Sequence, residues 1–207
     1  MEKGKLIVLE GLDGTGKATQ ARIIKETLEK KGKTVVNYAY PNYESKYGKI
    51  IGSFLRGEQN LDVGELFLLY LIDMVNEMKS MKDNLNSGKF VIVDRFFFST
   101  IAYQSSGGFD YEKAKEIVQI LDMPRPDIVL LLDANIDVSS ERKSKQKEDQ
   151  GGTDRFEKDV PFLQKVKQVY YILLKEKFYA GDWVLINSGK TVEEVSKPIL
   201  AEVEKLF

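Results

Sequence analysis

The sequence lacks two residue types that enzymes often use, because none of its 207 residues is a cysteine or a histidine. Their absence excludes disulfides, zinc sites built from thiolates or imidazoles, and nucleophilic dyads that need a histidine base. The formal net charge is only −1, so no overall positive field attracts nucleic acid or an anionic membrane, and we expect neither as a partner. Any chemistry must therefore use carboxylates, hydroxyls, lysines and arginines.

Long hydrophobic runs are also absent, since no apolar stretch approaches the roughly 18 residues that suggest a membrane-spanning helix. Charged residues, Glu2 and Lys3, follow the first methionine, and no signal-type segment is present. We therefore expect a cytoplasmic protein. The composition, 43% hydrophobic and 30% charged, is ordinary for a globular chain, and we expect residues 1–207 to form a single domain.

Short apolar runs alternate with longer amphipathic stretches along the chain. Most of the runs are continuous and rich in β-branched residues and leucine, which is typical of strands buried on both faces. The order strand, helix, strand predicts an α/β fold, with a five-stranded parallel sheet and helices on both faces. The predicted strands are 6–10, 34–40, 90–94, 127–133 and 183–187. The predicted helices are 17–31, 47–56, 65–87, 111–122, 137–147, 155–179 and 191–206.

The first predicted strand leads directly into GLDGTGKATQ, residues 11–20. The spacing G-x-x-x-x-G-K, between a strand and a helix, is that of a P-loop, in which backbone N–H groups and the helix N-terminus attract a polyphosphate. Thr19 stands where a dinucleotide fingerprint would need its third glycine, so a triphosphate is the expected ligand. The residues predicted to bind it are Gly11, Gly14, Thr15, Gly16, Lys17, Ala18 and Thr19.

The metal site is unusual, because a P-loop normally places serine or threonine after its lysine and this chain has Ala18. Asp94 ends a predicted strand, so its carboxylate is expected in the same crevice, where it holds Mg²⁺ directly or through water. Arg95, next to it, offers a planar fork for a second phosphate. In the alternative interpretation, Asp94 caps the following helix and pairs with Arg95.

Four segments resemble the thymidylate kinase family in their order and spacing: GLDGTGKATQ, YP (40–41), DRFFFSTIAYQ (94–104) and DRFE (154–157). Many NTPases share the P-loop, but Asp-Arg followed by Ser-Thr-x-Ala-Tyr-Gln is much more specific. The resemblance implies a P-loop kinase fold with a short lid at about 142–155. It also implies phosphoryl transfer from ATP, with Mg²⁺, to dTMP, giving dTDP and ADP, and a homodimer.

The resemblance assigns roles to individual residues. Asp13 would accept a hydrogen bond from the 3′-hydroxyl of dTMP, and Arg95 would hold its phosphate. Tyr103 would crowd a 2′-hydroxyl and so favour deoxyribose; the alternative for that stretch is a helix with a core tyrosine. The base and sugar would be lined by Tyr70, Ser99, Thr100, Tyr103 and Gln104. The catalytic residues would be Lys17, Asp94, Arg95 and two arginines of the lid, Arg142 and Arg155.

Two positions depart from the family pattern. Ala18 removes a metal-ligating hydroxyl, and Met74 stands where the family has an arginine that contacts the nucleotide. Met74 cannot donate a hydrogen bond, so selectivity for the base stays open. Tyr70, in the place of a stacking phenylalanine, can also stack. Three alternatives remain: a kinase for another nucleoside or nucleoside monophosphate, a P-loop protein that binds nucleotide without turnover, and a structural module.

Overall fold

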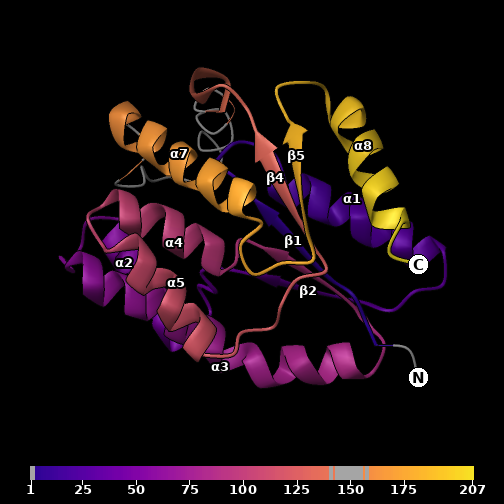
Figure 1. Cartoon of the computed structure of the whole chain (residues 1–207), viewed down its shortest axis with the longest axis horizontal. Helices are drawn as coiled ribbons and strands as arrows, with labels where there is room; N and C mark the ends of the chain where they lie inside the picture. The colour runs from indigo at the N-terminus through magenta and orange to yellow at the C-terminus, as the bar shows by residue number, and fades with distance from the viewer. Residues whose placement is uncertain (1–2, 140–141, 143–155, 157–158) are drawn as a thin grey trace.

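The computed structural model describes residues 3–139, 142, 156 and 159–207. Five parallel strands form one sheet in the order β2-β3-β1-β4-β5 (Figure 1). The strands are β1 (Leu6–Glu10), β2 (Val35–Ala39), β3 (Phe90–Asp94), β4 (Ile128–Asp133) and β5 (Asp182–Asn187). Each strand end lies within one residue of the predicted end, and the predicted α/β fold class is confirmed.

Helices cover both faces of the sheet, as Figure 1 shows. On one face, α1 (Lys17–Lys30) and α8 (Val192–Glu204) pack over Ile7 and Leu9 of β1. On the other face, α3 (Val63–Asn86), α4 (Phe97–Ser106) and α7 (Val160–Glu176) pack over Leu6 and Val8. Two further helices lie outside this layer, α2 (Lys46–Leu55) against α3 and α5 (Tyr111–Ile120) against α4.

The two edge strands are less buried than their apolar sequences predict. Strands β1, β3 and β4 are buried along almost their whole length, but β2 is partly exposed throughout and β5 alternates between buried and exposed residues. An edge strand has only one neighbour in the sheet, so the helices above and below cover it incompletely. The expectation of burial on both faces is therefore right for the central strands and wrong for β2 and β5.

Helix α4 is the one helix of the described residues that lies outside the predicted helical ranges. Its sequence, FFSTIAYQSS, begins as an apolar run without a clear polar face, and its N-cap residue, Phe96, supplies no side-chain cap. The alternative interpretation of this stretch, a helix with a core tyrosine, is right about the helix, but Tyr103 is only partly buried. None of the helices in the described residues is both long and apolar enough to cross a bilayer.

Candidate active site

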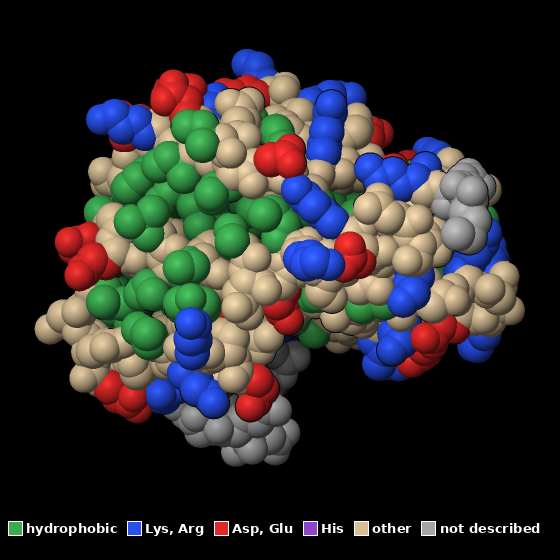
Figure 2. Space-filling model, turned by 90° about the horizontal axis from the view of Figure 1, so that it is seen from below, with side chains coloured by type: hydrophobic (Ala, Val, Ile, Leu, Met, Phe, Trp, Pro, Cys, Tyr) green, Lys and Arg blue, Asp and Glu red, His purple; other side chains and the backbone are tan. Residues whose placement is uncertain are grey.

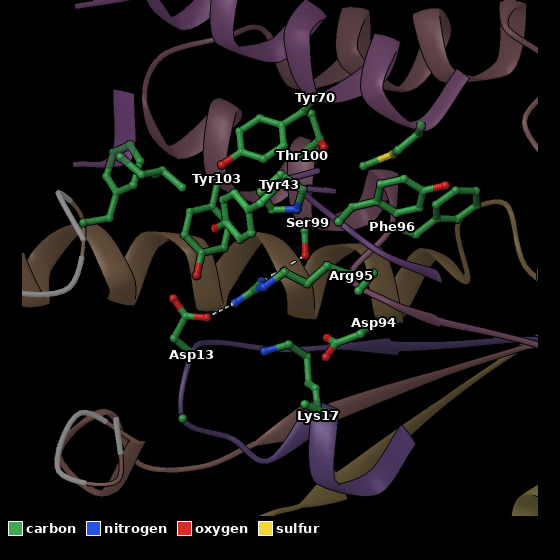
Figure 3. Close-up of a pocket in the computed structure, with 18 of the residues that line it drawn as sticks. Asp13, Lys17, Tyr43, Tyr70, Asp94, Arg95, Phe96, Ser99, Thr100 and Tyr103 are labelled. Carbon is green, nitrogen blue, oxygen red and sulfur yellow. Dashed lines mark hydrogen bonds and ion pairs between the residues drawn. The ribbon is translucent and has the colours of Figure 1, made fainter. Parts of the chain in front are cut away.

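A cavity of about 380 Å³ lies beyond the carboxyl ends of β1 and β3 (Figure 3). Its walls come from the P-loop, the start of α1, the connection after β2, α3, the end of β3, and α4. Most of the predicted site residues line it together: Asp13, Gly14, Gly16, Lys17, Ala18, Thr19, Tyr70, Asp94, Arg95, Ser99, Thr100, Tyr103 and Gln104. The fold thus brings segments far apart in the sequence to one place.

Gly11 and Thr15 belong to the P-loop but are not in the cavity wall; they line a small separate hollow between the loop, β4 and α7. The Thr15 hydroxyl donates to the carbonyl of Leu12 at 2.7 Å, inside the loop itself. Gly14 has φ +75°, and a Cβ there would lie 2.0 Å from the carbonyl oxygen of Ser139. Position 14 of the loop therefore needs a residue without a side chain, because the backbone at Ser139 lies directly against it.

Lys17 is buried at the first turn of α1, and its ammonium reaches back over the loop. Nζ donates to the carbonyl oxygens of Gly11 at 3.1 Å and Leu12 at 2.9 Å. Burial lowers the pKa of Lys17 to about 8, and the positive charge of Arg95 acts in the same direction. A phosphate that replaces the carbonyls would give this ammonium a full counter-charge.

Arg95 connects the P-loop to α4. One terminal nitrogen, Nη2, pairs with Asp13 Oδ1 at 2.5 Å, and the other, Nη1, donates to Ser99 Oγ at 3.1 Å (Figure 3). The guanidinium also lies over the ring of Tyr103, 5.5 Å from its centroid. The two residues predicted to contact the sugar and the phosphate of dTMP are thus in direct contact with each other.

Asp94 lies on the opposite side of the sheet from the α4 helix. In β3 it shares its face with Phe90 and Ile92, which pack under α1, and its charge raises the pKa of Lys17 against the stronger effect of burial. The backbone N–H of Phe96 donates to Glu10, and the ion pair of Arg95 is with Asp13. The alternative in which Asp94 caps α4 and pairs with Arg95 is therefore wrong.

The donors present in the cavity fit Mg²⁺ only together with a polyphosphate. The described residues contain no group of three or more carboxylate, histidine or cysteine side chains that would hold a metal by themselves. Asp94 offers one carboxylate beside the P-loop, and the side chain of Ala18 offers no oxygen. Because Mg²⁺ keeps most of its waters and takes phosphate oxygens, one carboxylate is a sufficient protein contribution.

The part of the cavity away from Lys17 is largely aromatic and apolar, which suits a nucleobase. The Thr100 hydroxyl is buried and has no hydrogen-bond partner among the described residues. Met74 is only 1% exposed and still lines the cavity, so it belongs both to the core and to the site. Ser99 also lines the cavity, and its hydroxyl is already bonded to Glu10, Tyr170 and Arg95.

Among the lining residues to which the sequence analysis gave no role are three aromatic ones, Tyr40, Tyr43 and Phe156. Tyr40 belongs to the YP segment, and Phe156 belongs to DRFE, so the motifs contained them without indicating a role. Tyr43 follows the YP segment and carried no signal. Glu10, which bonds to the N–H groups of Phe96 and Ser99, was visible only as an ionisable residue at the end of an apolar strand.

Arg142, one of the two predicted lid arginines, does not line the cavity wall that the structure describes. Arg142 donates to the carbonyl oxygens of Ser188 at 2.7 Å and Lys190 at 2.9 Å, in the connection between β5 and α8. Arg155 and most of the predicted lid lie outside the described residues. The roles of both arginines stay predictions.

Comparisons with known proteins cover nearly the whole chain. The family model described as thymidylate kinase matches residues 9–199. A thymidylate kinase of Arabidopsis thaliana is 34% identical over 201 residues, which are 95% of this chain and 70% of that protein. The thymidylate kinase of Danio rerio is 30% identical over 198 residues, which are 95% and 88% of the two chains.

A solved structure of thymidylate kinase from Candida albicans, described as revealing the origin of broad substrate specificity, superimposes with a TM-score of 0.79. It is 27% identical, and the match covers 98% of this chain and 92% of that one. The matched range of the family model begins in β1 and ends in α8, so it contains the end of β1, the other four strands and every residue of the cavity wall. The chain belongs to the thymidylate kinase family.

Proposed function

We propose that the protein transfers the γ-phosphoryl group of ATP to dTMP and releases ADP and dTDP. Membership of the family supports this reaction. The observation that carries the proposal is the arrangement around one cavity of a P-loop lysine, Lys17, a carboxylate, Asp94, and an arginine, Arg95. Residues 1–207 would act as one kinase domain, since all of these parts belong to one sheet and its helices. A cytoplasmic location stays a prediction from the sequence.

The acceptor would lie on the α3 and α4 side of the cavity. Arg95 is mostly buried and fixed by two bonds, so its charge can meet a phosphate without first being ordered. Asp13 would exchange part of its contact with Arg95 for the 3′-hydroxyl of dTMP. The base would lie between Tyr70 and the apolar wall, with Thr100 and Gln104 as its hydrogen-bonding partners, and Tyr103 would exclude a 2′-hydroxyl.

The donor would lie on the P-loop. The N–H groups from Gly11 to Lys17 would cradle its phosphates, with the side chain of Thr15 bracing the loop and Ala18 and Thr19 at the first turn of α1. Mg²⁺, when bound, neutralises charge on the phosphate oxygens. Asp94 would hold it from the protein side.

The transfer itself needs positions and charges rather than a general base. A monophosphate oxygen is already anionic near neutral pH, which is consistent with a chain that has no histidine. Lys17 would lie on the side of the donor phosphates and Arg95 on the side of the acceptor phosphate. Together they would stabilise the charge on the transferring phosphoryl group from both sides. Arg142 and Arg155 would add to this charge when the lid closes; for Arg142, closure would require its bonds to the β5–α8 connection to break.

The protein would form a homodimer through α3. Leu68 and Ile72 lie one turn apart on this helix and are 58% and 41% exposed. Figure 2 shows hydrophobic side chains gathered on the face that carries α2 and α3. A second copy of the chain could cover this face symmetrically, as the resemblance to a family of dimers implies.

A substrate panel tests the proposed reaction. ADP formation is measured with ATP, Mg²⁺ and one of dTMP, dUMP, UMP, dCMP or thymidine. We expect the highest kcat/KM with dTMP, and UMP as a poor substrate because of its 2′-hydroxyl. Replacement of Arg95 by alanine should raise KM for dTMP far more than KM for ATP. Binding of ATP without turnover of any acceptor would contradict the proposal.

A further inference from the structure

Glu10 is a fully buried carboxylate that takes no part in the mechanism above. In β1 it shares its face with Leu6 and Val8, so it points toward α4 and α7 rather than toward α1. A carboxylate without partners would be very costly in this core. Its environment must therefore supply several hydrogen-bond donors, and it does.

Four donors converge on the Glu10 carboxylate. Oε1 accepts from the backbone N–H groups of Phe96 at 2.8 Å and Ser99 at 3.3 Å. Oε2 accepts from Ser99 Oγ at 2.5 Å and from the Tyr170 hydroxyl at 3.0 Å. Glu10 thus supplies the cap that Phe96, the N-cap residue of α4, does not supply itself. One side chain links the strand before the P-loop to the helix that follows Arg95.

The link continues to the guanidinium of Arg95. Ser99 Oγ donates to Glu10 and accepts from Arg95 Nη1 at 3.1 Å, while Nη2 of the same arginine pairs with Asp13. Both ends of the guanidinium are therefore tied to β1 and its loop, one directly and one through Ser99. The backbone of Arg95 is also unusual, with φ +64°, and its N–H donates to the carbonyl of Leu9.

The hydrogen-bond pattern fits the ionised form of Glu10, because the two backbone N–H groups can only donate and the hydroxyls of Ser99 and Tyr170 can donate as well. A carboxylate only accepts, and a proton on Oε2 would change the Ser99 or Tyr170 hydroxyl from a donor to an acceptor toward Glu10. The charged groups that act on this network are Arg95, Lys17, Asp13 and Asp94. Burial raises the pKa of Glu10, while the hydroxyl of Ser99 and the N–H of Phe96 oppose that change.

We propose that Glu10 is a positioning residue for the acceptor: through Ser99 it fixes the guanidinium of Arg95 and so sets the affinity for dTMP, without contact to either nucleotide. The inference rests on the proposed function, because it takes Arg95 as the residue that holds the dTMP phosphate. It predicts an effect on one substrate only. A residue that merely stabilises the fold would change both affinities or neither.

The test measures dTMP and ATP binding separately by calorimetry. Glu10→Gln keeps the shape and one acceptor oxygen but places an NH₂ group where two hydroxyls donate. We expect the Kd for dTMP to rise about tenfold, as for the loss of a charge-assisted hydrogen bond, and the Kd for ATP to stay within about twofold. Ser99→Ala cuts the same link at its other end and should have a similar effect.

A double variant tests whether the two residues act in one path. If Glu10 acts through Ser99, the combination of Glu10→Gln with Ser99→Ala should weaken dTMP binding no more than the stronger single change. Tyr171→Phe is the matched control: it removes a hydroxyl bonded to the carboxylate of Asp133 at 2.7 Å, on the neighbouring residue of α7 but outside this network. It should leave both affinities unchanged.

Three results would overturn the inference: unchanged dTMP binding in folded Glu10→Gln, equal losses for both nucleotides, or additive effects in the double variant. If Glu10→Gln does not fold, the changes in Kd for dTMP and for ATP in Ser99→Ala test the inference instead. The proposed function is tested separately in the wild-type protein. Failure of the wild type to bind and phosphorylate dTMP would reject that function. Normal wild-type activity, together with variants that lose affinity for dTMP and ATP equally, would reject only the role of Glu10.

Discussion

Lys17 is easier to deprotonate in this site than in water, because it is buried and close to Arg95. Its pKa of about 8 falls within the range where activity is measured. Since only the ammonium attracts phosphate, kcat/KM for ATP should be level below this pH and fall about tenfold per pH unit above it. Bound ATP stabilises the ammonium, so the fall in kcat at saturating ATP should move to higher pH. Profiles of both quantities from pH 6 to pH 10 would check this.

Lys17→Arg provides the control, because a guanidinium does not titrate in that range. ATP binding by this variant, measured as Kd against pH, should lack the alkaline fall of the wild type. The same fall in both proteins would assign it to another group.

Ala18 offers a second test at the scale of one residue. Its side chain is exposed at the first turn of α1 and lines the cavity. Ala18→Thr should supply a hydroxyl to Mg²⁺ in place of a water, a gain of about 1 kcal/mol by comparison with a net hydrogen bond. The free Mg²⁺ needed for half the maximal rate should fall about fivefold, with little change in KM for dTMP.

Ala18→Val is the matched control for that experiment, because valine has the shape of threonine without its hydroxyl. It should leave the Mg²⁺ dependence at the wild-type value. If valine and threonine shift the curve equally, the effect comes from the shape of the loop and the metal lies out of reach of residue 18.

At the scale of secondary structure, short sequence motifs predicted the P-loop but not the hydrogen bonds through which Glu10 holds α4. The strand β1, the glycine spacing and Lys17 are adjacent in the sequence, so the P-loop could be recognised from its pattern. Glu10 contacts Phe96 and Tyr170, which are 86 and 160 residues away. No periodicity or motif spacing reports contacts over such separations, and for the same reason α4, capped from another strand, was not predicted as a helix.

Two of the P-loop glycines differ in why a side chain is unfavourable there: both have a positive φ, but only one lies against neighbouring backbone. Gly14 and Gly16 both have positive φ, +75° and +93°, but a Cβ would lie 2.0 Å from the carbonyl of Ser139 only at Gly14, and nothing lies within 4 Å at Gly16. Gly16→Ala should therefore cost about 1 kcal/mol of unfolding free energy from strain alone. Gly14→Ala should cost at least about 1 kcal/mol more, because backbone must move. Urea unfolding of both variants measures the difference, and equal losses would contradict the close approach.

At the scale of the whole molecule, the sequence indicates which residues are apolar but not which of them are left exposed by the fold. The runs that became β2 and β5 look like buried strands, yet both lie at sheet edges with exposed residues. Leu68 and Ile72 belong to the same amphipathic pattern as the core residues of α3, although they face outward. Burial depends on the arrangement of all the elements, and a helix with apolar residues on two sides is distinguished only when its neighbours are known.

The proposed dimer can be tested on that outward face of α3. Ile72→Glu places a charge on a surface that would meet its own copy, so a symmetric interface would contain the charge twice. We expect the wild type to sediment as a dimer at micromolar concentration and Ile72→Glu as a monomer. Ile172→Glu is the matched control, since Ile172 is 45% exposed against 41% for Ile72 but lies on α7, away from α3. This control should remain dimeric. Equal sedimentation of the two variants, or a monomeric wild type, would show that α3 is not the interface.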